Sequence, residues 1–294
     1  MNNVEFEIPF VLGLVSLFSP FLGMIFTLAY CGKILSQTAV RQLLALLAYI
    51  LTMAAIAVFD NSPAVWLNAA DSIIGTGLGC LVFVLILRRC QKLTLALTIL
   101  LLVQIGYYLL RSWMFAPAIQ ALSLQLKPVY EMYLERMPKL DFNTDAISWI
   151  QSFLLRYQTA IWGSFQILAV FLGFMLFNKY SANKQKIRYI KFPYEVVYLM
   201  IAALMLTLIP TTRTWGLNAL VCMSMFYLIQ GTAVLSFVWG DYFARVKLMR
   251  TLLITAVIVN YPILILIALV GIIDNWFDFR KLNLMEEKHE SDPD

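Results

Sequence analysis

Long apolar runs are the feature that most constrains this chain. They begin near Phe10, Leu43, Ala64, Leu93, Ile147, Phe192, Gly216 and Leu252. Each run is long enough to cross about 30 Å of hydrocarbon as a helix, and the mean hydropathy of +0.79 is far from that of an ordinary soluble domain. The runs are apolar all round, whereas the strands of a membrane barrel alternate. The sequence therefore predicts an all-α, polytopic membrane bundle of about eight transmembrane helices.

Basic residues gather in every second connection, as in Arg88 to Lys92 and Lys179 to Lys191. The positive-inside rule assigns such connections to the cytoplasm. The net charge of +5 is thus explained by topology, so we expect the lipid bilayer, and no nucleic acid, as the partner of these charges. The same alternation places both termini outside, although Arg280 and Lys281 after the last run oppose it.

Nothing in the composition divides the chain into separate membrane domains. We expect one helical domain over residues 1–280 and a polar, acidic tail over residues 281–294. The connection from Ala116 to Ala146 predicts a short amphipathic helix between the fourth and fifth spans, with Lys127-Pro128 at its first turn. Ser19-Pro20 interrupts the first run, which is then either one kinked helix or two half-helices.

Asp71 lies inside the third apolar run and is followed at four-residue spacing by Gly75 and Gly79. A charge at the centre of a membrane helix costs roughly 2.5–3.5 kcal/mol on insertion scales, so it needs a partner or a cavity. The spacing puts all three residues on one helical stripe, where glycines permit close packing. We expect Asp71 to face the protein interior and to pair with Arg111 or Arg156.

Polar residues of other runs fall in the same outer half of the membrane. Together they form a candidate ligand-binding set: Asp71, Gln104, Arg111, Arg156, Gln166 and Asn218. Arg156 and Gln166 share a helical face that we expect to point inward. Two cations against one acid favour an anionic or carboxylate ligand held bidentately by arginine. The other interpretation is a buried ion pair and a snorkelling arginine that only hold the helices in register.

Recognisable catalytic machinery is missing from the sequence. The single histidine, His289, lies in the polar tail, and the four cysteines have no paired spacing. The glycines from Gly75 to Gly79 lack the preceding strand of a nucleotide-binding loop, and no Walker A, zinc-protease or serine-hydrolase motif occurs. We therefore expect no enzyme, no metal site and no cofactor.

Small residues line one side of the first apolar run. They are Gly13, Ser16, Ser19 and Gly23. Small side chains let backbones approach closely in membranes, so this side suits packing against a neighbouring helix or another membrane protein.

The last hundred residues carry short motifs of a different kind. They are Phe192-Pro193-Tyr194-Glu195, Asn218 followed by Tyr227-Leu228-Ile229-Gln230-Gly231, and Gly271 and Asp274 followed by Trp276-Phe277-Asp278-Phe279-Arg280. These motifs resemble the YybS-like family of predicted bacterial inner-membrane proteins, a family without an established activity. The resemblance makes Gln230, Gly231, Asp274 and Arg280 family-motif positions, and it implies a multi-pass protein of the bacterial inner membrane.

The same resemblance implies a function. The family's helical domain is thought similar to the substrate-binding S components of energy-coupling-factor transporters. We therefore expect an S-component-like small-molecule binding or transport subunit with a pocket in the outward half. The first run lacks the Ala-x-x-x-Ala through which S components typically meet their partner, which is a departure from that pattern. The alternative is a non-transport scaffold or assembly factor that binds another membrane protein through the small side of the first run or the glycine stripe.

Overall fold

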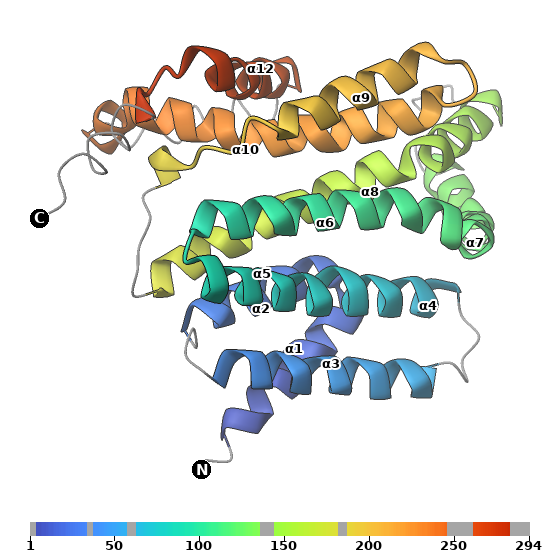
Figure 1. The fold of residues 1–294 in the computed structure, drawn as a ribbon. Coiled ribbons are helices and arrows are strands. Elements are labelled where there is room, and N and C mark those ends of the chain that lie inside the picture. The colour runs from blue at the N-terminus through green and yellow to red at the C-terminus, as the bar shows by residue number, and fades with distance from the viewer. Residues whose placement is uncertain are drawn as a thin grey trace, which may run out of the picture.

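The computed structural model describes residues 4–33, 38–57, 63–135, 144–181, 187–245 and 261–282. Every regular element in these ranges is a helix, as the fold class predicts (Figure 1). In chain order they are α1 (Val4–Phe18), α2 (Pro20–Lys33), α3 (Thr38–Ala57), α4 (Pro63–Ala70), η2 (Asp71–Leu78), α5 (Gly79–Cys90), α6 (Leu93–Met114), α7 (Ala116–Glu135), α8 (Thr144–Tyr180), η3 (Ile187–Tyr189), α9 (Val196–Leu208), α10 (Arg213–Arg245) and α12 (Tyr261–Phe277).

Four helices within the described ranges are long and apolar enough to cross a membrane. They are Val65–Cys90, which combines α4, η2 and α5, followed by Leu93–Met114, Ser152–Tyr180 and Arg213–Gly240. The other expected spans correspond to shorter apolar helices. The start of the eighth run, from Leu252 to Asn260, and most of the acidic tail lie outside the described residues. The chain is therefore a multi-pass helical membrane protein.

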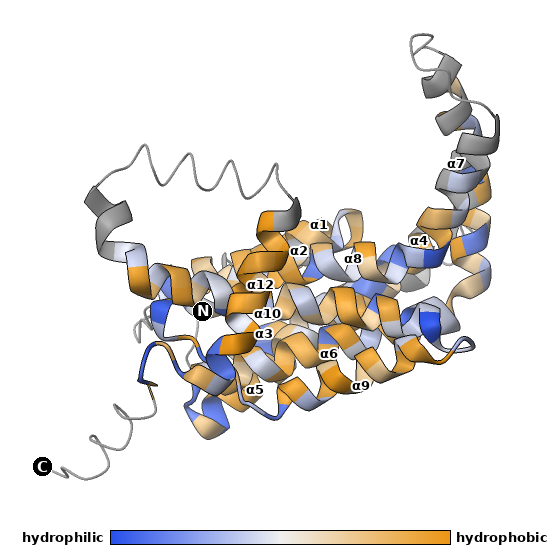
Figure 2. Ribbon diagram, turned by 90° about the horizontal axis from the view of Figure 1, so that it is seen from above, coloured by the Kyte–Doolittle hydropathy of each residue, from blue (hydrophilic) through white to orange (hydrophobic). Residues whose placement is uncertain are grey.

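The helices lie side by side in layers (Figure 1). We call the end where α2, α5 and α8 finish and α6 begins the basic end; it is on the left in Figure 1 and carries Lys33, Arg88 and Lys179. The main core lies among α2, α5, α6, α8 and α10. Apolar residues also cover much of the outside of these helices (Figure 2), as expected for surfaces that face lipid.

The first apolar run is two helices. Pro20 has no N–H to donate to the Ser16 carbonyl, so the helical ladder is interrupted there. Ser19 accepts a hydrogen bond from the Leu22 N–H at 3.4 Å and so caps α2. The bend is sharp, because a Cβ added to Gly23 would lie 2.5 Å from the Ser16 Cα. α1 crosses α3 near Tyr49, whereas α2 packs along α8.

The helix between the fourth and fifth predicted spans differs from its prediction. α7 begins at Ala116 and is 20 residues long, with Pro128 inside it. The first-turn position that we assigned to Pro128 belongs to Pro117, where a missing N–H costs least. α7 packs against α4 and α8, and it extends away from the other helices in Figure 2.

Two helices of the C-terminal half make very different contacts. α9 buries Val196, Val197 and Ala203, and most of its other side chains are exposed. α12 instead crosses α10 so closely that a Cβ on Gly231 would lie 1.9 Å from the Ile267 carbonyl oxygen, and one on Gly271 would lie 2.2 Å from that of Tyr227. Only glycine fits at both faces of this crossing.

We predict that Gly231→Ala separates α10 from α12. Overpacking of this kind costs about 1–3 kcal/mol, so the purified protein should unfold at a lower temperature in a fixed detergent. Gly106→Ala is the matched control, because a Cβ there meets nothing within 4 Å. Equal melting temperatures for the two variants would contradict the close crossing.

Candidate functional site

Asp71 opens a π-helical segment in the middle of a span. Residues Asp71–Leu78 form this wider helix, and α4 and α5 continue it on either side. π-Helical turns are rare and are frequently found at functional sites. The segment contains Gly75 and Gly77, which leave room for side chains of neighbouring helices. A Cβ on Gly77 would lie 2.3 Å from Leu47 of α3.

The Asp71 carboxylate is fully buried and receives four hydrogen bonds. Arg111 donates from Nε to Oδ1 at 2.7 Å and from Nη2 to Oδ2 at 2.9 Å. Tyr107 donates its hydroxyl to Oδ1 at 2.8 Å, and Trp162 donates its indole N–H to Oδ2 at 2.9 Å. Both oxygens therefore have two donors each, which offsets the cost of removing the charge from water.

The predicted pairing of an inward-facing Asp71 with an arginine is confirmed, and the partner is Arg111. The Arg111 guanidinium also lies 5.7 Å from the centre of the Trp162 ring, within the range of a cation–π contact. Arg156, in contrast, is exposed, and the expectation that it points inward is wrong. It lies near the end of the span, where a long cationic side chain can reach the interface and need not face the bundle.

The predicted glycine stripe packs against α6. A Cβ on Gly79 would lie 2.7 Å from Gln104 Nε2, and one on Gly75 would lie 3.0 Å from the Tyr108 hydroxyl. Gln104 donates to the Gly75 carbonyl at 2.7 Å. Its own Oε1 and the Tyr108 hydroxyl have no partner, although both are buried beside Gly75. We call Asp71, Gln104, Tyr107, Tyr108, Arg111 and Trp162 the outer polar cluster.

Gln166 and Asn218, the remaining residues of the candidate ligand-binding set, lie outside the outer polar cluster. Gln166 is buried on α8, and its Nε2 has no hydrogen-bond partner. Asn218 is buried and fully used in joining α10 to α8: it accepts from the Ala160 N–H at 2.9 Å and donates to the carbonyls of Arg156 and Thr214 at 3.1 and 2.9 Å. Its side chain therefore holds two helices together.

Small residues of the first run also pack within the chain. Gly13 contacts Ile50 of α3 at 3.5 Å from its ideal Cβ position, and Gly23 contacts Ser16 across the bend. Gly13, Ser16 and Gly23 are all buried. This side of the first run thus packs against neighbouring segments of the chain itself, which is the first of its two expected uses, and it does not form an open docking face for a partner protein.

A second polar cluster lies at the basic end, where the family-motif residues meet. Arg280 donates to Asp274 at 2.6 Å and to the carbonyls of Arg188 and Ile190 at 2.8 Å each. Gln230 donates to Asp274 at 3.1 Å and accepts from the Phe192 N–H at 3.2 Å. We call Gln230, Asp274 and Arg280 the inner polar cluster. It joins α10 and α12 to the segment that precedes α9.

This cluster reverses a topology prediction. Arg280 reaches the backbone of the basic connection that the positive-inside rule assigns to the cytoplasm. The end of α12 therefore lies on the same side as that connection, and the prediction of an outer C-terminal end is wrong. Arg280 and Lys281 no longer oppose the rule.

Tyr107 and Trp162 are the site residues that sequence reasoning missed. Aromatic side chains inside apolar runs are typical of packing, and neither residue interrupts its run. The signal that could have found them is position. Tyr107 lies four residues before Arg111, and Trp162 lies beside Gly163 and four residues before Gln166, so each lies about one helical turn from a residue of the candidate ligand-binding set.

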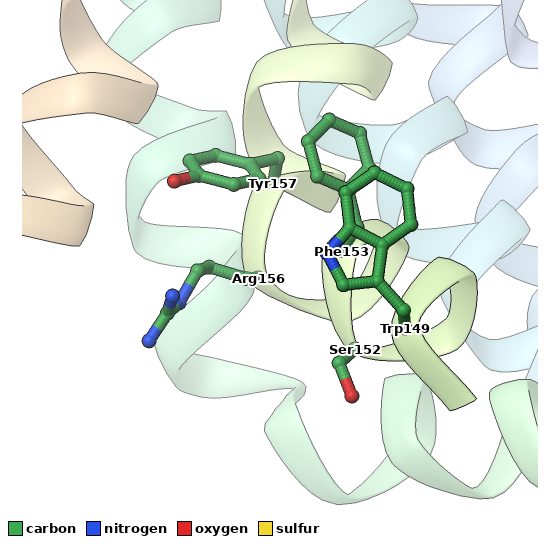
Figure 3. Close-up of a pocket in the computed structure, with 5 residues that line it drawn as sticks. All are labelled: Trp149, Ser152, Phe153, Arg156 and Tyr157. Carbon is green, nitrogen blue, oxygen red and sulfur yellow. The ribbon is translucent and has the colours of Figure 1, made fainter. Parts of the chain in front are cut away.

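A hollow of about 280 Å³ lies on one face of α8 (Figure 3). Its described lining consists of Trp149, Ser152, Phe153, Arg156 and Tyr157. The Trp149 and Phe153 rings are stacked with centroids 5.4 Å apart, and Arg156 extends away from them in Figure 3. The hollow thus combines an exposed cation with aromatic surface near the end of a span.

Fold and site together define a multi-pass helical membrane protein with two buried polar clusters. In the part of the chain that the structure describes, no group of three or more His, Cys, Asp or Glu residues is placed to hold a metal ion. No protein-family model, curated protein or solved structure matches the chain. The resemblance to the YybS-like family therefore stays a prediction.

We predict that Asp71→Asn destabilises the protein by about 3–5 kcal/mol, because it leaves the Arg111 cation buried without its counter-charge. The measurement is the free energy of unfolding in detergent. The double variant Asp71→Leu with Arg111→Leu removes both charges. Its loss in free energy of unfolding should be smaller than the sum of the losses in the single variants Asp71→Leu and Arg111→Leu. Additive losses would show that the two side chains are not coupled.

A second prediction concerns the inner polar cluster. A reporter fused after Asp294 should lie on the same side of the membrane as one inserted in the connection at residues 182–186, because Arg280 binds the backbone of residues 188 and 190. Each of the two sites is fused in turn to a reporter that is active only in the cytoplasm and to one that is active only outside it, and the active reporter gives the side on which the site lies. Opposite locations of the two insertions would contradict it.

Proposed function

We propose that this chain is a small-molecule binding or transport subunit of the bacterial inner membrane, with its site at the outer polar cluster. Ionisable residues within membranes are functional-site candidates by default, since their burial is costly. The ligand class that fits is a small anion or carboxylate, because Arg111 belongs to this cluster and a second cation, Arg156, lies at the hollow on α8.

The observation that carries this proposal is a pair of unused polar atoms. Gln104 Oε1 and the Tyr108 hydroxyl are buried without partners beside Gly75. An unsatisfied buried polar atom costs about 1–3 kcal/mol, and no bulk water is available in the hydrocarbon region to reduce that cost. A ligand with one acceptor and one donor group would satisfy both atoms. The neighbouring ion pair already holds Asp71 in place.

The Asp71 carboxylate has no free hydrogen-bond acceptor position, and this supports a second proposal for the function. Both Asp71 oxygens have two donors, so the ion pair is complete without a ligand. In this interpretation its sole role is to fix the register of α6 and α8 against η2. A scaffold or assembly factor would need no more than this. That alternative has lost its expected docking faces, however, since Gly13, Gly23, Gly75 and Gly79 all pack within the chain.

Tyr108→Phe tests the binding function. It removes an unpartnered hydroxyl, so we expect unchanged or slightly higher stability and about three- to tenfold weaker ligand retention, the worth of one hydrogen bond. The protein is purified from native membranes, and its bound small molecules are measured by mass spectrometry. Tyr227→Phe is the matched control, because Tyr227 is also buried with an unpartnered hydroxyl but lies on α10.

Equal ligand retention by the two variants would contradict a site beside Gly75. A stoichiometric protein partner in the same preparation, with no small molecule bound, would favour the scaffold.

A further inference from the structure

The break between α1 and α2 leaves the Ser16 carbonyl without its usual helical donor. Pro20 cannot donate to the Ser16 carbonyl, whereas the Ser19 N–H still donates to the Val15 carbonyl and the Gly23 N–H to the Ser19 carbonyl. The break lies directly against η2, at a depth where every backbone group needs a partner. Side chains of η2 meet this need.

Ser72 and Thr76 of η2 approach the break in parallel register. The Ser72 hydroxyl lies 2.6 Å from the Ser16 carbonyl oxygen and 2.6 Å from that of Asn68. The Thr76 hydroxyl lies 3.4 Å from the Pro20 carbonyl oxygen. Both contacts across the break join residues 56 apart in sequence, so the end of α1 and the start of α2 both lie against η2. We call these five oxygens, with the Ser16 hydroxyl, the oxygen cluster.

A serine hydroxyl has one proton, so Ser72 can donate to only one of its two carbonyl neighbours at a time. The Ser16 hydroxyl is completely buried in the bend beside Gly23 and has no partner. Ser72 and Thr76 are also buried, at 0% and 1% exposure. The result is an oxygen-rich, water-excluded spot with unused lone pairs.

We propose that the oxygen cluster binds a dehydrated monovalent cation, Na⁺ or K⁺. Carbonyl and hydroxyl oxygens are hard ligands of the kind such cations prefer, and broken helices in membranes coordinate coupling ions through unwound carbonyls. A divalent ion is a poor fit, because it normally requires carboxylates and the nearest one, Asp71, is committed to Arg111. The proposal goes beyond the proposed function, since Ser72 faces α1 whereas Asp71 faces α6.

The test is cation-dependent thermal stability. The full chain, purified in detergent, is unfolded in NaCl, KCl and choline chloride at one ionic strength. At tenfold excess over Kd, the bound cation should raise Tm by about 3 °C over choline. Ser72→Ala and Thr76→Val should abolish this rise, and Thr76→Ser should retain it.

Two controls keep the result specific. Ser224→Ala and Thr98→Val remove hydroxyls that donate only within their own helices, to Leu220 and Thr94, and both should keep the cation-dependent rise. Should Ser72→Ala fail to fold, Ser16→Ala replaces it, since that hydroxyl has no partner to lose. Equal Tm values in the three salts, or a rise that survives in the Ser72 and Thr76 variants, would overturn the proposal.

Discussion

The bidentate ion pair between Asp71 and Arg111 is the interaction on which the arrangement of this bundle depends. In hydrocarbon, neither charge is tolerable alone, so the helices that carry them must stay aligned to within hydrogen-bond distance. Tyr107 and Trp162 complete the carboxylate and bring in α8. The Asp71 carboxylate thus holds η2, α6 and α8 in alignment. The small residues of η2 make this alignment possible because they leave space for the Gln104 side chain.

The two polar clusters solve the same problem differently. The outer pair is side-on, with each Asp71 oxygen fully used. The inner pair is end-on: Arg280 uses its Nη1 for two backbone carbonyls, and Asp274 Oδ1 and Arg280 Nε have no partner. The inner cluster therefore ties a loop segment to a helix crossing, whereas the outer cluster aligns membrane spans.

Sequence reasoning found charges in apolar surroundings and missed what surrounds them. Asp71 and Arg111 were predictable because any charge in an apolar run requires a partner. The inward orientation of Arg156 was wrongly predicted, since helical spacing gives a shared face but not its direction near a helix end. The role of Arg280 was hidden because backbone carbonyl acceptors leave no trace in a sequence, and the π-helix of η2 has no residue signature of its own.

The sparse packing of α9 has a consequence for the bilayer itself. At 13 residues, this helix is about 20 Å long at 1.5 Å per residue, against about 30 Å of hydrocarbon. Since most of its side chains face outward, lipid acyl chains are its main neighbours. Such hydrophobic mismatch is relieved by local thinning of the bilayer. The protein should therefore gather short-chain lipids along this one edge and favour thin membranes.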